Sequence, residues 1–219
     1  MRVEVWSDVV CPWCYIGKRR LERALAEFPH RDEVEVVWRS YQLDPGAPAE
    51  VTQSAAEYLA GKYGGGLAGA HRMMDQVEAV AAEEGLLYRL RDTQRVNTRD
   101  AHRLLHHALE TGGVAVQGRL KEALLAAYFL QARNVADHDV LVELADAAGL
   151  EEKGVRAALD SNAHDAAVEA DVARAAAYGA GGVPFFVVEE RYGVSGAQPA
   201  ETFRQLLDRA WRDSHPAHA

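Results

Sequence analysis

The N-terminal stretch alternates apolar and polar side chains as a half-buried strand does. Val3 and Val5 begin a run that continues to Val9–Val10 and ends at a cysteine motif. Pro12 suits the first position of a following helix, because the N–H that proline lacks would be unpaired there. The apolar stripe of this helix consists of Cys14, Gly17, Leu21, Ala24, Leu25 and Phe28, and Pro29 marks its end. Alternation returns over 34–43, so the beginning of the chain predicts strand–helix–strand with the cysteines at the first strand-to-helix junction.

The middle of the chain, from Ser54 to Tyr178, is rich in Ala, Leu and Glu and predicts helices joined by short loops. Ser54 and Glu57 have the spacing of a capping box. Thr98 is expected to cap a helix that stops at Gly112–Gly113. The glycine-rich segment 61–69 predicts a flexible loop. The helical segments expected are 67–85, 98–111, 119–131, 137–148, 155–159 and 164–178.

The last part of the chain returns to a strand pattern. Phe185–Val188 is a short apolar run, 189–191 reads as a turn, 192–194 as a return strand, and Pro199 opens a final helix. The order is therefore βαβ, a helical block, then ββα. This order predicts an α/β fold in which residues 1–48 and 179–219 form one domain and residues 49–178 form an all-helical insertion.

Charge and hydropathy exclude several classes of partner. The 219-residue chain has a formal net charge of −9, which does not fit the basic footprint of a nucleic-acid-binding protein. No window approaches the about 18 consecutive apolar residues of a membrane span, so no membrane partner is expected. The N-terminus has no basic start followed by an apolar run, as a secretory signal would. If Met1 is the true start, we expect a cytoplasmic protein.

The chain contains two cysteines, Cys11 and Cys14, in a Cys-Pro-Trp-Cys motif. A bridge between them would close a loop too short to stabilise a fold of this size. A four-cysteine zinc site is excluded because there is no second pair. Cytoplasmic disulfides are usually transient and catalytic. The cysteines therefore predict redox chemistry.

Position in the predicted helix assigns different roles to the two cysteines. The thiolate is the reactive form, and the partial positive charge at a helix N-terminus should lower the pKa of Cys11. Cys11 is therefore expected to form a mixed disulfide and Cys14, one turn further on, to resolve it. Pro12 and Trp13 should tune the redox potential, and the uncharged Trp13 predicts a centre less oxidising than one with histidine there.

Three further positions are candidates for the site. Asp8, just before the motif, either relays protons during exchange or caps the loop. Val183 and Pro184 follow two glycines and precede an apolar strand, where a proline without an N–H belongs. From the residues alone the Val183–Pro184 bond can be cis or trans.

The Cys11–Cys14 motif after a short strand, Gly182-Val183-Pro184-Phe185 near the C-terminus, and the helical block between them resemble the DsbA family. Within it, the segments 7–17, 97–98 with 101–103, and 193–198 resemble the FrnE-like subgroup. The resemblance implies a thioredoxin-like fold interrupted by a helical domain. It also implies a cis Val183–Pro184 bond against the cysteines, a backbone contact between Val183 and the partner, and a site contact by Asn97. Without the resemblance, Asn97 is a turn residue.

The sequence departs from some FrnE-like proteins in lacking a second cysteine pair, so Cys11 and Cys14 are expected to exchange directly with an outside thiol. The related kappa-class glutathione transferases and hydroxychromene-carboxylate isomerases usually carry serine where this chain has Cys11, which favours redox chemistry. A glutathione-dependent isomerase or transferase remains the alternative. No tightly bound cofactor is expected, although glutathione could be a co-substrate. The expected partner is a thiol- or disulfide-containing protein or small molecule, and a homodimer is left open.

Histidines on the predicted helix after Thr98 provide a second candidate chemistry. His102 and His106 are four residues apart, with His107 adjacent, a spacing that could hold a metal. They flank the apolar stripe, so we interpret them as solvated helix histidines and expect no metal site. Trp6 and Trp38 are expected to pack the sheet, and Trp13 to be exposed beside the sulfurs.

Overall fold

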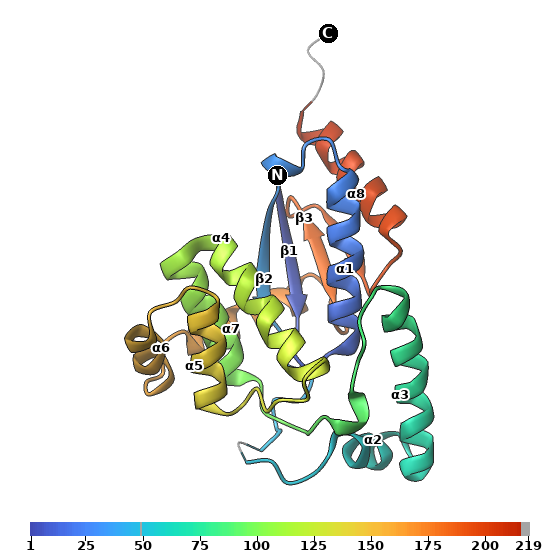
Figure 1. The fold of residues 1–219 in the computed structure, drawn as a ribbon. Helices are drawn as coiled ribbons and strands as arrows, with labels where there is room; N and C mark the ends of the chain where they lie inside the picture. The colour runs from blue at the N-terminus through green and yellow to red at the C-terminus, as the bar shows by residue number, and fades with distance from the viewer. Residues whose placement is uncertain (49, 216–219) are drawn as a thin grey trace.

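The sheet that carries the site has four strands. In the computed structural model, which describes residues 1–48 and 50–215, these are β1 (Arg2–Ser7), β2 (Glu35–Ser40), β3 (Phe185–Val188) and β4 (Tyr192–Ser195). Their order is β2-β1-β3-β4, and β1 runs parallel to β2 and antiparallel to β3 (Figure 1). The chain thus brings its first and last segments together in one sheet, which confirms the predicted α/β fold class.

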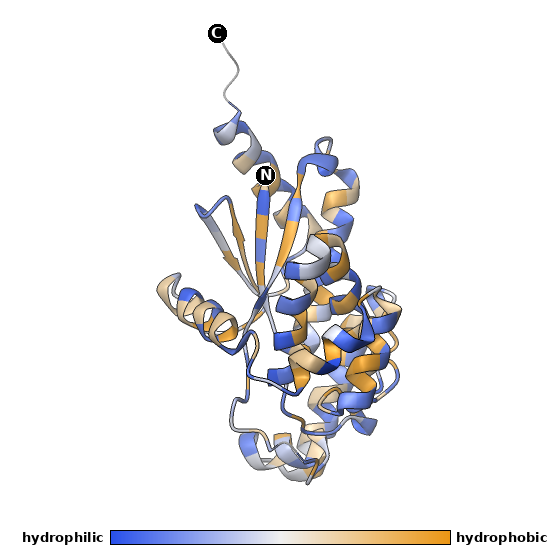
Figure 2. Ribbon diagram, turned by 90° about the vertical axis from the view of Figure 1, so that its left-hand side faces the viewer, coloured by the Kyte–Doolittle hydropathy of each residue, from blue (hydrophilic) through white to orange (hydrophobic). Residues whose placement is uncertain are grey.

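Helices pack on both faces of the sheet, and the apolar residues of the strands reflect this. On one face, Val3 and Val5 pack with Phe186 against α1 (Pro12–Glu27) and α8 (Ala200–Ser214). On the other face, Trp6 packs with Phe185 near α7 (Asp165–Ala177). The unbroken apolar run of β3 follows from this arrangement, since its successive side chains point into two different cores. Figure 2 shows the alternation of hydrophilic and hydrophobic residues along the strand that begins at the N-terminus.

The helices between β2 and β3 surround a second and larger core. They are α2 (Ala55–Tyr63), α3 (Gly66–Glu83), α4 (Arg99–Phe129), α5 (His138–Ala147), α6 (Glu152–Leu159) and α7, and short 3₁₀ turns lie at η1 (Arg31–Glu33) and η2 (Leu90–Asp92). Leu104, Leu120 and Leu124 of α4 are completely buried in this core. Tyr15 and Ile16 of α1 join the same cluster, so the helix that carries the cysteines is held by both cores.

The helix boundaries confirm some local predictions and correct others. The capping box of Ser54 and Glu57 is present at the start of α2. The predicted end at Gly112–Gly113 is a kink, because Gly113 has φ 70° and the helix resumes beyond it. The predicted flexible loop over 61–69 shrinks to the two residues between α2 and α3. Thr98 occupies the N-cap of α4, but its side chain makes no capping hydrogen bond.

The start of the chain also differs from its prediction in one respect. Strand β1 ends at Ser7, so Val9 and Val10 lie in the turn that leads to Cys11. The Val9 N–H donates to the Asp8 carboxylate at 2.7 Å, which removes it from the ladder of the sheet. No helix in the described part of the chain is long and apolar enough to span a bilayer.

The outer edge of β2 is satisfied by side chains from the helical region. The Trp38 N–H donates to Gln117 Oε1 at 3.0 Å, and Gln117 Nε2 donates to the Trp38 carbonyl at 2.9 Å. The Ser40 N–H donates to Asp171 Oδ2 at 2.8 Å. An unpaired strand edge would otherwise expose these groups. These bonds join α4 and α7 to the sheet and hold the helical region against the redox motif.

Candidate active site

The two cysteines lie at the N-terminus of α1, as predicted. Cys11 is the N-cap residue and Pro12 the first residue of the helix, and the Cys14 N–H donates to the Cys11 carbonyl at 2.9 Å. Both are free thiols and both are buried, whereas Trp13 between them is 40% exposed. The motif thus places two sulfurs on the inner side of the first helical turn and an indole on the outer side.

The segment with Val183 and Pro184 lies directly against this turn. The Val183–Pro184 peptide bond is cis. The Cys11 Sγ–H points to the Val183 carbonyl at 3.5 Å. Gly17 allows the close approach, because a Cβ there would lie 3.1 Å from the Pro184 Cγ atom and 3.2 Å from Phe186. A larger residue in this turn of α1 would push the Pro184 segment away from the sulfurs.

The two thiols ionise as a coupled pair. The hydrogen bond with Cys14 and burial raise the pKa of Cys11 well above that of an ordinary thiol. Burial also acts on Cys14, but the hydrogen bond from Cys11, the charge of Lys121 and the Ser7 hydroxyl outweigh it and lower the pKa of Cys14. The expectation that the helix N-terminus lowers the pKa of Cys11 is therefore wrong for the free dithiol. The neighbouring sulfur and burial outweigh the partial charge, so the two thiols shift in opposite directions.

A cavity of about 450 Å³ opens in front of Cys11, and its walls come mostly from α2, α3, η2 and the end of α4. Cys11, Pro12, Trp13 and Val183 line it, and Cys14 is not among its lining residues. The wall contributed by the helical region is largely apolar and includes Leu59, Met74, Val77, Leu90, Val96 and Phe129. The site can therefore present one of its two sulfurs to a ligand that enters beside the helices.

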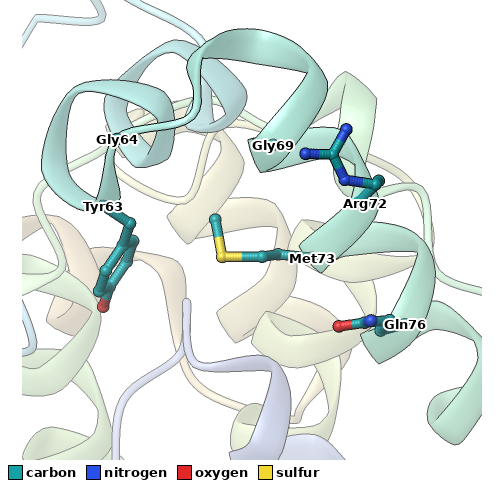
Figure 3. A pocket seen from close by; sticks show the side chains of 6 residues that line it. All are labelled: Tyr63, Gly64, Gly69, Arg72, Met73 and Gln76. Carbon is teal, nitrogen blue, oxygen red and sulfur yellow. The ribbon is translucent and has the colours of Figure 1, made fainter.

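The mouth of this cavity carries exposed apolar side chains. Trp13, Leu43 and Tyr63 are 40%, 42% and 64% exposed and all line the cavity. A smaller hollow of about 290 Å³ lies next to it and shares Tyr63 and Met73 with it. In Figure 3 the Met73 side chain extends from α3 toward Tyr63, while the Arg72 guanidinium lies beside Gly69. The approach to Cys11 is thus bordered by apolar surface.

Asp8 is completely buried behind the motif. Its carboxylate accepts the N–H groups of Val9 and, at 2.8 Å, Leu43, and it lies 3.2 Å from His102 Nε2. Burial raises the pKa of Asp8, but the contacts to His102 and Leu43 and the charge of Lys121 outweigh it, so this pKa lies below the ordinary value. Asp8 therefore acts as a buried carboxylate that joins the motif to the 41–47 segment and to α4. Its role as a proton relay stays a prediction.

His102 and His106 of α4 are buried and not solvated, which corrects the sequence interpretation for these two residues. His102 is completely buried against Asp8. His106 is also buried, with Nε2 3.1 Å from Ser40 Oγ and 3.0 Å from Asp171 Oδ2. In residues 1–48 and 50–215 no group of three or more His, Cys, Asp or Glu side chains is arranged to hold a metal. Both histidines link α4 to neighbouring segments through polar contacts.

Asn97 lies outside the residues that line the Cys11 cavity. Its Oδ1 accepts the Arg99 N–H at 2.8 Å, and its Nδ2 donates to the Ala47 carbonyl at 2.8 Å. Asn97 therefore provides the side-chain hydrogen bond expected of Thr98 at the start of α4. This structural role anchors the segment before α2, and the site contact that the resemblance implied for Asn97 stays a prediction.

Two residues near the sulfurs were missed from the sequence. Lys121 of α4 is completely buried, and its Nζ donates to the Ser7 carbonyl at 3.3 Å. Tyr88 donates its hydroxyl proton to the Pro12 carbonyl at 2.8 Å. The sequence offered a signal for Lys121, because it follows Leu120 and lies one helical turn before Leu124 and Leu125, beside the apolar stripe of this helix. A lysine on the inner face of a helix is rare without a partner.

Comparison with known proteins agrees with this geometry. Residues 2–208 match the family described as DSBA-like thioredoxin domain. The chain belongs to this family. The DsbA resemblance seen in the motifs is thereby confirmed, and the family is one of DsbA-like thiol–disulfide oxidoreductases.

Solved structures of the same fold extend the comparison. The chain is 49% identical to a probable DsbA oxidoreductase from Streptomyces coelicolor, with a TM-score of 0.91 and coverage of 100% of this chain and 93% of that one. A 2-hydroxychromene-2-carboxylate isomerase matches with a TM-score of 0.72 and 13% identity, over 100% of both chains. The cytosolic disulfide reductase DsbM from Pseudomonas aeruginosa, solved with glutathione, matches at 0.64 and 18%, over 97% of this chain and 100% of that one. At these low identities the last two show the fold alone.

Proposed function

We propose that this DsbA-like chain is a dithiol–disulfide exchange enzyme in which Cys11 forms the mixed disulfide and Cys14 resolves it. The observation that carries the proposal is the unequal placement of the sulfurs. Cys11 borders the cavity and Cys14 does not. The Val183 carbonyl, which precedes the cis bond to Pro184, lies 3.5 Å from the Cys11 sulfur, where an extended thiol ligand could pair with the backbone.

The exchange proceeds in two displacements. In the free pair the thiolate is favoured on Cys14, so Cys11 reaches its reactive form by passing its thiol proton to Cys14, and the Cys11 thiolate then attacks one sulfur of a substrate disulfide. The substrate S–S bond breaks, one substrate half leaves as a thiolate, and a Cys11 mixed disulfide remains. The Cys14 thiolate then attacks the Cys11 sulfur and releases the second half. Two protein thiols are oxidised, one substrate disulfide is reduced, and the reverse sequence oxidises a dithiol.

The walls of the cavity indicate which substrates suit it. Its lining is mainly apolar, and Trp13, Leu43 and Tyr63 extend this surface outward. Of its charged lining residues, Arg95 is paired with Asp44 at 2.7 Å. We propose that the substrate is either an apolar extended peptide segment beside a cysteine or a compact small-molecule thiol. Residues 49–178, proposed as an insertion domain, would supply most of the specificity.

Trapping of the mixed disulfide tests this proposal. Cys14→Ala should accumulate a Cys11-linked adduct with a thiol substrate, which non-reducing mass spectrometry detects and dithiothreitol releases. Cys11→Ser is the matched control and should form no adduct and reduce no insulin. The proposal is contradicted if the unaltered protein catalyses neither insulin reduction nor dithiol oxidation above the uncatalysed rate. Adducts on Cys14 in a Cys11→Ser protein would instead reverse the assigned roles.

A second candidate is a glutathione-dependent isomerase or transferase. The observation that favours it is the cavity in front of Cys11, whose size of about 450 Å³ suits a bound small molecule. The likeness of fold to a 2-hydroxychromene-2-carboxylate isomerase and to a glutathione-bound disulfide reductase supports it further. In that case Cys11→Ser should retain isomerase activity with glutathione, whereas a disulfide exchange enzyme loses all activity. The two variants of the preceding test thus separate the candidates.

Two narrower assignments belong to the same proposal. The segments 7–17 and 193–198 support membership of the FrnE-like subgroup. A cytoplasmic setting fits a centre with uncharged Trp13 between its cysteines, and a cytosolic reductase shares the fold. Measurement of the redox equilibrium with glutathione tests the cytoplasmic setting, because a strongly oxidising centre would not suit a reducing compartment.

A further inference from the structure

Behind Cys14 lies a charge that the exchange described above does not use. Lys121 of α4 is fully buried, with its Nζ 3.3 Å from the Ser7 carbonyl and 5.6 Å from the centre of the Trp38 ring. In the described ranges 1–48 and 50–215, no carboxylate lies within 4.0 Å of it. Lys18, the other buried lysine nearby, has Glu122 at 2.5 Å. A buried ammonium without a close carboxylate is costly for folding, so it calls for another explanation.

The groups around Lys121 belong to the redox centre. Cys14, Asp8 and Cys11, in this order of strength, favour its charged form, while Lys18 opposes it and burial opposes it most. Burial dominates, so these influences together lower the pKa of Lys121 to about 8. In the other direction, the charge of Lys121 lowers the pKa of Cys14 and of Asp8, and it also lowers that of His102. Trp38 of β2 contributes an uncharged ring.

We propose that Lys121 is a positioning residue that stabilises the Cys14 thiolate during the resolving step. This rests on the proposed exchange reaction and concerns the half of it that follows the mixed disulfide. Once Cys11 is bonded to a substrate sulfur, its thiol can no longer donate a hydrogen bond to Cys14. The charge of Lys121 is then the strongest remaining stabilising influence on a Cys14 thiolate.

The resolving step balances in protons and electrons. Cys14 gives its thiol proton to water, and the charge of the Lys121 ammonium stabilises the thiolate formed. The thiolate attacks the Cys11 sulfur, the bond from Cys11 to the substrate breaks, and the substrate leaves as a thiolate that takes a proton from water. The new Cys11–Cys14 disulfide carries no charge. In the disulfide form neither cysteine can be an anion, and of the three groups that favour the Lys121 ammonium Asp8 remains. The Lys121 ammonium is therefore less stable in the disulfide form than in the dithiol form.

The first test measures ionisation of Cys14 without any substrate, in a chain with Cys11→Ala, where Cys14 alone remains. Thiolate absorbance near 240 nm is followed against pH with Lys121 intact, Lys121→Met and Lys121→Arg. Lys121→Met should raise the pKa of Cys14 by about one unit, a tenfold smaller thiolate fraction at neutral pH. Lys121→Arg, which keeps the charge, should restore at least half of that loss.

Lys18→Met is the matched control, because it removes a neighbouring buried lysine whose charge already has carboxylate partners. It should leave the Cys14 titration unchanged. Lys121→Met should also be at least as stable to heat as the parent protein, since it removes a buried charge but keeps the side-chain length. A folded Lys121→Met protein with an unshifted Cys14 titration overturns the proposal. Failure of insulin reduction alone would not, because this titration needs no exchange activity.

The second test uses the unaltered chain and so remains available if the variants do not fold. The protein has four lysines, Lys18, Lys62, Lys121 and Lys153. Nuclear magnetic resonance of ¹³Cε-labelled lysine should show one that titrates near pH 8 in the dithiol form and at a lower pH after oxidation to the disulfide. Four lysines that titrate at the ordinary value, or a low-titrating lysine indifferent to oxidation, would overturn the proposal.

Discussion

The contact between Gln117 and the edge of β2 yields a quantitative prediction. The N–H and C=O of Trp38 both point away from the sheet, and the Gln117 amide pairs with both at 3.0 and 2.9 Å. Gln117 is completely buried. Leucine has a similar volume but no polar atom, so Gln117→Leu leaves the packing nearly intact and removes two hydrogen bonds to the strand edge.

The magnitude follows from the two backbone groups left without partners. A buried N–H or C=O without a hydrogen bond costs about 1–3 kcal/mol. Trp38 is 5% exposed, so water gives little compensation at the intact edge, although local opening of α4 can admit some. We therefore expect Gln117→Leu to lower the free energy of unfolding by about 2–4 kcal/mol. For a chain of this size this corresponds to a fall in Tm of about 5–15 °C.

Urea unfolding followed by circular dichroism checks this prediction. The matched control is Gln205→Leu, since the Gln205 amide donates to Glu201 on the exposed surface of α8, and its expected change is below about 0.5 kcal/mol. A Gln117→Leu midpoint equal to that of the control would refute the reasoning. It would mean that other groups satisfy the edge of β2 and that Gln117 does not hold α4 to the sheet.

Three further changes test the site. Trp13→His should make the centre more oxidising in equilibrium with glutathione, because a protonated imidazole stabilises the thiolate; an unchanged or more reducing equilibrium would count against this. Asp8→Asn should lower stability more at pH 7 than at pH 3. The depressed pKa of Asp8 means that its carboxylate contributes above the unfolded pKa of about 3.9 and loses this contribution as pH falls through the folded pKa, so equal urea midpoint differences at both pH values would disprove it. Gly17→Val should slow insulin reduction and lower the Tm, because its branched side chain meets Pro184, whereas Gly61→Val, with open space around its Cβ position, should not slow the reaction.

Local patterns accounted for much of the fold. Alternation in β1, the apolar stripe of α1 and the capping box at Ser54 were each visible in a short window, because such signals depend on neighbours along the chain. The redox motif was visible for the same reason, since Cys11 and Cys14 are one helical turn apart. The errors arose where one residue could serve two purposes. Val9 and Val10 looked like strand residues, but the Asp8 carboxylate takes the Val9 N–H and turns the chain.

The surroundings of the sulfurs depend on contacts between distant segments. Asp8 meets His102 across 94 positions and Ser7 meets Lys121 across 114, and neither contact leaves a periodic pattern. Packing against opposing segments buries His102 and His106, which the sequence pattern suggested were solvated. Proximity of the second thiol reversed the expected pKa direction of Cys11. The amino-acid order therefore specified the elements and the reactive cysteines, because these follow from local geometry. The ionisation of the pair, the cavity in front of Cys11 and the charge behind Cys14 required the packed fold, because electrostatic and packing energies depend on distance in space.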